Sequence, residues 1–181
     1  MKPELLDPIE WESITQVIDI EFGKEVTKKL LGNKTPIVIM KESQRNIYLI
    51  PLSWMNMLLD ESPEDFEYHL IGKQLGVVSK ERFRLSLQIL QELAGLTNRR
   101  LVVSKKAAEA FTYGRSILKE SVIRFDENLK RRQRVLVMNE DSECLGIAAL
   151  SIDSEKIDRL SGDKLVGKNL VDIGWFIRRL G

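Results

Sequence analysis

The chain has 181 residues, of which 43% are apolar and 30% are charged, and its formal net charge is +1. Its apolar content suffices for one or two hydrophobic cores. No apolar run approaches the roughly 18 residues of a membrane span. Since the start MKPELLDPIEWE also lacks the sequence blocks of a signal peptide, we expect a cytoplasmic protein. One cysteine, Cys144, and one histidine, His69, are too few for an internal disulfide or a Cys/His zinc site.

The first part of the chain predicts helices around a β-hairpin. Asp7 as the cap and Pro8 at the first helical position predict a helix over residues 7–23. Its expected apolar stripe is Ile14, Val17, Ile18 and Phe22. A shorter helix is expected over 24–34, then a hairpin of strands 36–42 and 45–51. Ser53 begins a predicted helix over 53–62, with expected core residues Trp54, Met55, Leu58 and Leu59.

Residues 68–98 predict two more strands and a domain boundary. The strands are expected over 68–78 and 82–89, because apolar residues alternate with polar ones in RFRLSLQI. LQELAG adds a helical turn, and GLTN at 95–98 is the best boundary signal. We therefore expect an N-terminal α/β domain over 1–96 and a second domain over 97–181.

After Asn98 the sequence is typical of short strands joined by tight turns. Strands are expected over 99–104, 121–125, 132–139, 144–152 and 173–180, with one helix, SKKAAEAF, at 104–111. Gly114 is expected to stop this helix. NEDSE at 139–143 is the clearest hairpin turn. Short strands at this spacing favour a small barrel or sandwich.

Few residues suggest catalysis. The sequence contains no GxxxxGK[ST] phosphate loop, and GKQLG lacks the spacing of a nucleotide-binding glycine motif. His69 is more typical of a strand residue than of a general base. Adjacent acids such as Asp126 and Glu127 point apart on a regular element, so they do not form an acid/base pair. We expect no enzyme activity and no cofactor.

Charge is distributed unevenly along the chain. Residues 1–70 hold seven Lys and Arg against thirteen Asp and Glu, a net charge of −6, whereas the remainder holds 21 against 14, a net charge of +7. This asymmetry indicates that the C-terminal half meets a polyanion. A solvated surface without a ligand explains the same numbers.

Ten cations are candidates for contact with phosphate. Two occupy the first turn of the predicted helix at 104–111, where the helix dipole disfavours cations and a bound phosphate would favour them. Others follow Gly114, are interleaved with apolar residues at 156–168, or end the chain. The ten candidate cations are Lys105, Lys106, Arg115, Lys119, Lys156, Arg159, Lys164, Lys168, Arg178 and Arg179.

Several motifs resemble those of a known family. AEAFTYGRSILKESV, with Gly114, Leu118 and Val122, and LGIA at 145–148 resemble the PUA domain, a small RNA-binding pseudobarrel. Ser121 stands where a second glycine is usual. Together with GKQLG, FRLSLQILQEL and VDIGWFIRR, in this order, they are similar to the large-subunit ribosome-biogenesis proteins called nuclear import protein seven, which archaea and eukaryotes share.

The resemblance implies a fold and a function. The fold class is α+β, with an N-terminal antiparallel sheet and packed helices, then a C-terminal PUA β-pseudobarrel. Archaeal members imply a monomer that binds single-stranded U- or AU-rich RNA through the basic PUA face and acts in pre-rRNA maturation without catalysis. The exosome and ribosome-assembly proteins are the implied protein partners.

Two alternatives remain at this point. The protein could be an adaptor whose acidic N-terminal domain docks a basic ribosomal partner while the PUA unit is only a scaffold. It could also be an RNA-modifying enzyme or its fragment, because PUA modules are often attached to catalytic domains. The second alternative is weaker, because the N-terminal region is short and carries no cofactor motif.

Overall fold

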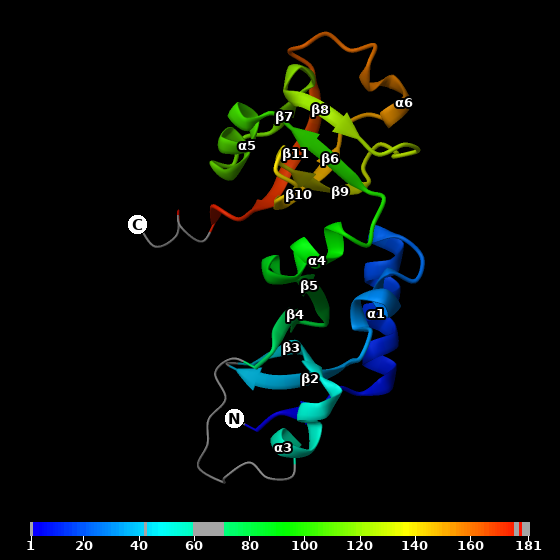
Figure 1. Ribbon diagram of the computed structural model, residues 1–181, viewed down its shortest axis with the longest axis vertical. Helices are drawn as coiled ribbons and strands as arrows, with labels where there is room; N and C mark the ends of the chain where they lie inside the picture. The colour runs from blue at the N-terminus through cyan, green and yellow to red at the C-terminus, as the bar shows by residue number, and fades with distance from the viewer. Residues whose placement is uncertain (1, 42, 60–70, 176–177, 179–181) are drawn as a thin grey trace. The chain divides into compact units, whose positions relative to one another are not determined.

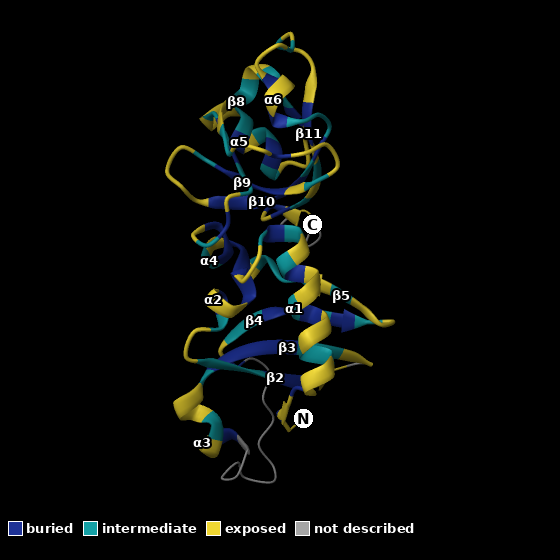
Figure 2. Ribbon diagram, turned by 90° about the vertical axis from the view of Figure 1, so that its right-hand side faces the viewer, coloured by how far each residue is buried: buried dark blue, intermediate teal, exposed yellow. Residues whose placement is uncertain are grey.

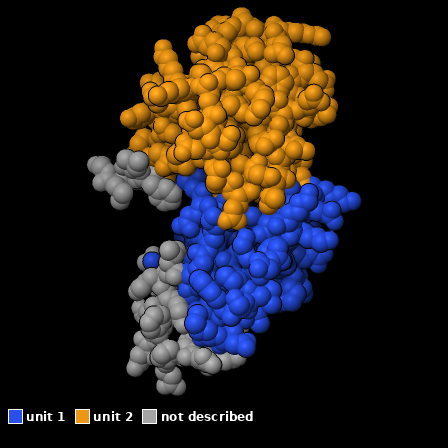
Figure 3. All heavy atoms as spheres, in the orientation of Figure 1, with its two compact units in different colours: residues 1–20, 24–89 blue, residues 21–23, 90–181 orange. Residues whose placement is uncertain are grey.

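The computed structural model describes residues 2–41, 43–59, 71–175 and 178 (Figure 1). The chain folds as two compact units, which Figure 3 colours separately. Unit 1 comprises Met1–Ile20 and Lys24–Ile89, and unit 2 comprises Glu21–Gly23 and Leu90–Gly181. The domain boundary between residues 96 and 97 remains our proposal.

Unit 1 is built on an antiparallel sheet in the order β1-β2-β3-β4-β5. Its strands are β1 (Glu4–Leu5), β2 (Lys34–Lys41), β3 (Gln44–Pro51), β4 (Lys73–Ser79) and β5 (Arg82–Leu85). Its helices are α1 (Pro8–Phe22), α2 (Val26–Leu31) and α3 (Met55–Leu59), with 3₁₀ turns η1 (Leu52–Trp54) and η2 (Leu87–Ile89).

Helix α1 begins where its sequence signals predict. The carboxylate of Asp7 accepts hydrogen bonds from the amides of Ile9 at 2.9 Å and Glu10 at 3.1 Å, which satisfies donors that a helix N-terminus leaves free. Ile14 and Phe22 are buried, whereas Val17 is 41% exposed. The helical stripe is therefore one residue narrower than predicted.

Two further predictions for unit 1 are wrong. Trp54 was expected in the core but is 42% exposed, because its η1 turn buries no side chain; Leu58 is buried as predicted. The strand expected over 82–89 ends at Leu85, where the chain turns into η2. The parts of the predicted elements at 60–62 and 68–70, together with His69, lie outside the described residues.

Unit 2 holds a six-stranded sheet in the order β7-β11-β10-β9-β6-β8. β6 and β9 are parallel, and the other pairs are antiparallel. The strands are β6 (Arg100–Val103), β7 (Ile117–Leu118), β8 (Val122–Phe125), β9 (Arg134–Met138), β10 (Cys144–Leu150) and β11 (Leu165–Asp172). The helices are α4 (Leu90–Ala94), α5 (Lys105–Thr112) and α6 (Ser154–Ile157), with the 3₁₀ turn η3 (Lys119–Ser121).

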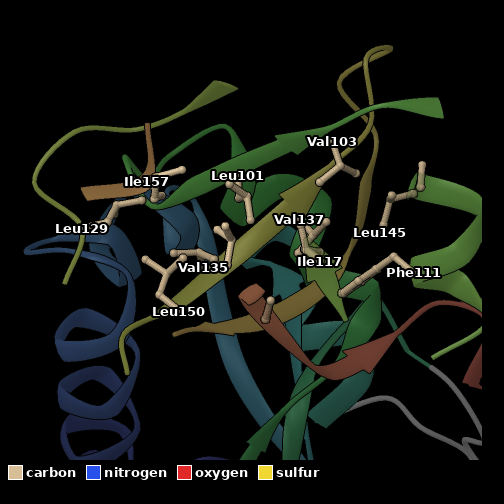
Figure 4. Packing of buried hydrophobic residues seen from close by; sticks show 13 residues of the cluster. Leu101, Val103, Phe111, Ile117, Leu129, Val135, Val137, Leu145, Leu150 and Ile157 are labelled. Atoms are coloured by element: carbon tan, nitrogen blue, oxygen red, sulfur yellow. The ribbon is translucent and has the colours of Figure 1, made fainter. Parts of the chain in front are cut away.

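The sheet of unit 2 curls around one apolar core. Side chains from both halves of the sheet and from α5 meet inside it, as Figure 4 shows for Leu101, Val137 and Phe111. These three residues are fully or almost fully buried. The predicted α+β fold, with an N-terminal antiparallel sheet and a C-terminal pseudobarrel, is confirmed. In the described part of the chain, no helix has the length and apolarity to cross a membrane.

The last strand lies earlier than predicted. We expected residues 173–180 to form a strand, but β11 spans Leu165–Asp172 and the chain turns at Ile173 and Gly174 before a helical Trp175. The cations interleaved with apolar residues at 156–168 predict a connection, but the last part of that segment, from Leu165 on, belongs to β11. Within this strand Gly167 is buried against the side chains of Ala148, Ile117 and Leu101.

Candidate nucleic-acid interface

The turn after α5 places the first candidate cation. Gly114 adopts a positive φ of 86°, a conformation that glycine takes without steric cost. The amide of Arg115 donates to the carbonyl of Ala110 at 3.1 Å, which closes the helix. Ile117 is then buried in the core of unit 2 and begins β7. Gly114 thus ends the helix as predicted and leaves Arg115 exposed.

Strand pairing brings four candidate cations onto two neighbouring segments. Ile117 pairs with Gly167 and Leu118 with Leu165. The amide of Lys119 also donates to the carbonyl of Lys164 at 2.8 Å. Residues 115–119 therefore run antiparallel beside residues 164–169. These two segments, named here the β7/β11 edge, carry Arg115, Lys119, Lys164 and Lys168.

Asn169 fixes the turn of Arg115 to strand β11. Its side-chain amide donates to the carbonyl of Phe111 at 2.8 Å and lies 3.5 Å from the carbonyl of Arg115. It also donates to the carboxylate of Asp172 at 3.2 Å. Asn169 is not among the site residues predicted from the sequence, since no local motif marks an amide that bonds across strands.

The cations of the β7/β11 edge differ in their partners. Lys119 forms an ion pair with Asp158 at 3.0 Å, and Lys164 lies 3.7 Å from its exposed neighbour Asp163. The hydroxyl of Ser161 and then Lys164 hold the pKa of Asp163 below its ordinary value. Arg115 and Lys168 are exposed, and neither side chain has an ion pair or hydrogen bond within the described residues. These two remain available to an anion.

The α6 region adds one cation that has no side-chain partner among the described residues and one that is paired. Arg159 is exposed and follows Asp158, the partner of Lys119, so it lies close to the β7/β11 edge. Lys156 instead forms an ion pair with Asp153 at 3.2 Å. The backbone amide of Arg131 and the side chain of Lys156 hold the pKa of Asp153 below its ordinary value.

The N-terminus of α5 already has an anionic partner from its own chain. The carboxylate of Glu140 accepts a hydrogen bond from the amide of Lys105 at 3.0 Å. A groove of about 560 Å³ beside it is also lined by Glu109 and Asp141. Lys105 and Lys106 have exposed side chains, but a phosphate at this helix end would have to displace Glu140. The helix end is therefore less open to an anion than its sequence indicates.

Arg178 stabilises the end of unit 2 from within. Its guanidinium donates to the two carboxylate oxygens of Asp172 at 3.0 and 2.9 Å and also bonds the carbonyl of Thr112. Asp172 is only 2% exposed. The hydrogen bonds from Arg178 to Asp172 raise the pKa of the guanidinium above its ordinary value. Arg179 lies outside the described residues.

Other surface groups of unit 2 were not selected from sequence. Tyr113 is 75% exposed beside Gly114. Arg124 and Arg132 are exposed and have no side-chain partner among the residues described. Those residues also contain no group of three His, Cys, Asp or Glu side chains placed to hold a metal ion.

Comparisons with known proteins agree with this architecture. The sequence model of the UPF0113 PUA domain matches residues 99–181. A UPF0113 protein of Archaeoglobus fulgidus is 34% identical over 110 residues, which are 61% of this chain and 62% of that protein. A 60S ribosome subunit biogenesis protein NIP7 homolog of Tetraodon nigroviridis is 28% identical over 109 residues, which are 60% of this chain and 61% of that protein. The chain thus spans about three fifths of these relatives.

A solved structure extends the likeness of fold to both units. A conserved PUA domain protein from Thermoplasma acidophilum superposes with a TM-score of 0.62 at 10% identity, covering 99% of this chain and all of that one. At this identity the match supports the fold alone. The resemblance stated from the sequence is confirmed: residues 99–181 match the UPF0113 PUA domain, and a UPF0113 protein and a NIP7 homolog are similar to part of the chain.

Proposed function

We propose that this protein binds single-stranded U- or AU-rich RNA through the basic side of its PUA unit and acts in ribosome biogenesis. Its RNA target is rRNA or pre-rRNA, and the protein neither catalyses a reaction nor uses a cofactor. The contacts are made by the candidate cations of unit 2, with Arg115 and Lys168 at the centre. Ribosome-assembly proteins and the exosome are the partner proteins, and the chain is a monomer.

The observation that carries this proposal is the pair of unpaired cations on the β7/β11 edge. Arg115 and Lys168 come from neighbouring segments, are exposed, and have no acid to neutralise them within the described residues. Asn169 holds the Arg115 turn in place before any ligand binds, which lowers the cost of ordering on binding. The match of residues 99–181 to the UPF0113 PUA domain and the similarity to a 60S ribosome subunit biogenesis protein add support for a role in ribosome biogenesis.

Salt-dependent RNA binding tests the proposal. Fluorescence anisotropy with an oligouridylate should give a slope of log affinity against log salt of about −3 to −4, as expected for four to six phosphate contacts. The double variant Arg115→Glu/Lys168→Glu should weaken binding by about tenfold or more at low salt, because it replaces two attractive contacts with two repulsive ones.

A matched control separates local contact from total charge. Lys24 and Lys29 are exposed lysines of unit 1 whose side chains have no partner among the described residues. Lys24→Glu/Lys29→Glu therefore produces a similar change in charge outside the PUA unit. It should retain most of the affinity. Equal losses in both double variants, or no binding by the wild type at any salt concentration, would contradict the proposal.

A second candidate function is a protein adaptor, and the ion pairs of unit 2 favour it. Four candidate cations already face acids: Lys119, Lys156, Lys164 and Arg178. A surface neutralised in this way offers less attraction to RNA than its sequence suggests. Partner capture from an extract that survives Arg115→Glu/Lys168→Glu and nuclease treatment would favour this candidate.

A further inference from the structure

The β4–β5 hairpin of unit 1 projects charge from the edge of a sheet. Ser79 pairs with Arg82, so only Lys80 and Glu81 form the turn. Both have positive φ, 49° and 60°, the backbone of a type I′ turn. β5 is the last strand in its sheet, and the tip of the hairpin is exposed (Figure 2).

The alternation along β5 sends its arginines to one face. Arg82 and Arg84 are exposed, while Phe83 between them is half-buried. Phe83 lines a groove with Ile14 and Val17 of α1, so this face of the strand is directed toward the helix. Since successive side chains of a strand point to opposite faces, Arg82 and Arg84 lie on the face away from α1.

These cations lack the acid partners found elsewhere in unit 1. Arg45, on the α1 side of the sheet, forms an ion pair with Glu10 at 3.0 Å. In contrast, the side chains of Lys80, Arg82 and Arg84 have no ion pair or hydrogen bond in the described part of the chain. A single charge on an edge strand is explained by the need to block pairing with another sheet. Three neighbouring cations exceed what that role requires.

A row of amide and hydroxyl groups continues from Arg84 across the same face. Val77 pairs with both Arg84 and Asn46, which places these residues on one side of the sheet. The side-chain amide of Gln74 donates to Asn46 at 3.1 Å, and the hydroxyl of Ser86 donates to Gln74 at 3.4 Å. The three polar side chains are half-buried, so each keeps part of its surface in water.

We propose that this hairpin is a second RNA contact site, separate from the PUA unit. Lys80, Arg82 and Arg84 bind backbone phosphates, and the row of Asn46, Gln74 and Ser86 offers donors and acceptors to bases or to the ribose 2′-hydroxyl. The proposal rests on the RNA binding inferred above and adds a site to it.

RNA fits this surface better than an acidic protein does. Arginine presents a planar fork of donors that matches phosphate geometry, and amides and hydroxyls beside it suit the base edges and 2′-hydroxyls of a single strand. An RNA held by the PUA unit also raises the effective concentration of its own flanking nucleotides at a second site. A weak cationic surface then contributes to affinity without strong binding by itself.

The test compares the double variant Arg82→Glu/Arg84→Glu with the wild type on oligouridylates of increasing length. We expect a short ligand of about 8 nucleotides, within the size of one binding module, to bind equally well. A ligand of about 30 nucleotides should bind about tenfold more weakly to the variant, and its salt slope should be smaller by about 1.4 because two phosphate contacts are lost.

Controls separate this proposal from the one on which it depends. Lys24→Glu/Lys29→Glu gives the same charge change elsewhere in unit 1, and Arg82→Lys/Arg84→Lys, which keeps the charge, should restore most of the affinity. Circular dichroism verifies that each variant is folded. Cross-linking of the long wild-type complex should label the peptide that contains residues 80–85.

The outcomes distinguish the two proposals. If the wild type binds no oligouridylate, the proposed function itself fails. If the wild type binds, but Arg82→Glu/Arg84→Glu matches the Lys24→Glu/Lys29→Glu control at every length, the hairpin site is overturned and the PUA interface stands. Binding to polyglutamate, a mimic of an acidic protein, is measured with the same variants. If Arg82→Glu/Arg84→Glu loses binding to polyglutamate but not to any oligouridylate, the hairpin RNA site is also overturned, because the partner would then be an acidic protein.

Discussion

The β7/β11 edge of unit 2 and the β4–β5 hairpin of unit 1 both present cations without a side-chain partner in the described part of the chain, but the two surfaces position these cations by different means. At the edge, Arg115 and Lys168 are far apart in sequence and become neighbours because β7 pairs with β11. In the hairpin, Arg82 and Arg84 share one short strand whose register is set by a two-residue turn. One arrangement depends on tertiary bonds and the other on local backbone geometry.

This difference determines what should disrupt each surface. The edge relies on buried side chains such as Asp172, which accepts hydrogen bonds from both Asn169 and Arg178. The charged face of the hairpin carries only the half-buried hydrogen bonds among Asn46, Gln74 and Ser86, and among the described residues none of these bonds involves Arg82 or Arg84. Changes to the buried bonds of unit 2 should therefore affect the edge and leave the hairpin intact.

The largest effect is expected from Asp172→Ala. The substitution leaves the donors of Asn169 and Arg178 without their acceptor, and loss of this buried network should lower the free energy of unfolding of unit 2 by about 2 kcal/mol or more. Hydrogen exchange should show lost protection in β11 and normal protection in β4. Asp163→Ala, which removes an exposed acid from the loop before β11, should change neither.

Equal loss of protection in β4 and β11 after Asp172→Ala would contradict the claim that the β7/β11 edge and the hairpin are stabilised independently. It would mean that the two units unfold together and that the hairpin depends on the same buried bonds. The measurement thus also tests whether the division into units at residues 89 and 90 describes separate folding behaviour.

The next effect concerns Asn169→Ala. The turn that carries Arg115 loses its bond to the carbonyl of Phe111, while the charge of the interface is unchanged. We expect about three- to fivefold weaker RNA binding, because Arg115 must then be ordered when the ligand binds. Anisotropy measures the affinity, and faster amide exchange over residues 112–117 would separate a positioning role from a direct contact. Unchanged affinity with faster exchange would remove Asn169 from the site.

Local signals in the sequence predicted the elements that depend on local structure. Asp7 capped α1 as expected, Gly114 ended α5 at a positive φ, and the turn at Asn139–Glu143 closed its hairpin with backbone and side-chain bonds. Each of these features involves residues within a few positions of one another. Such patterns carry their own physical cause, so they remain visible without the fold.

The composition of the candidate site depended on contacts that the sequence does not display. The ion pair between Lys119 and Asp158 joins residues 39 positions apart, and Glu140 reaches the amide of Lys105 across 35 positions. Neither acid belongs to a motif. The sequence therefore predicted where cations are concentrated, but it could not indicate which of them an acid already neutralises.

A smaller effect should follow from Asp158→Asn, which releases Lys119 from its ion pair. The freed lysine adds one cation to the β7/β11 edge, so RNA affinity at low salt should rise about threefold and the salt slope should steepen by about 0.7. Glu127→Gln removes the same charge from an exposed residue of unit 2 that has no partner in the described chain. A similar gain in this control would show that only net charge matters.

The smallest effect is expected at the tip of the hairpin. Glu81 occupies the second position of a type I′ turn with a φ of 60°, where glycine is favoured because a Cβ makes a left-handed backbone costly. Glu81→Gly should therefore stabilise unit 1 by about 0.5 kcal/mol in thermal or urea unfolding. Glu127→Gly, at a similarly exposed position without a positive φ, should destabilise or have no effect. If Glu81→Gly instead destabilised unit 1, the turn would not by itself set the register of Arg82 and Arg84. The hairpin would then depend on tertiary contacts, as the β7/β11 edge does.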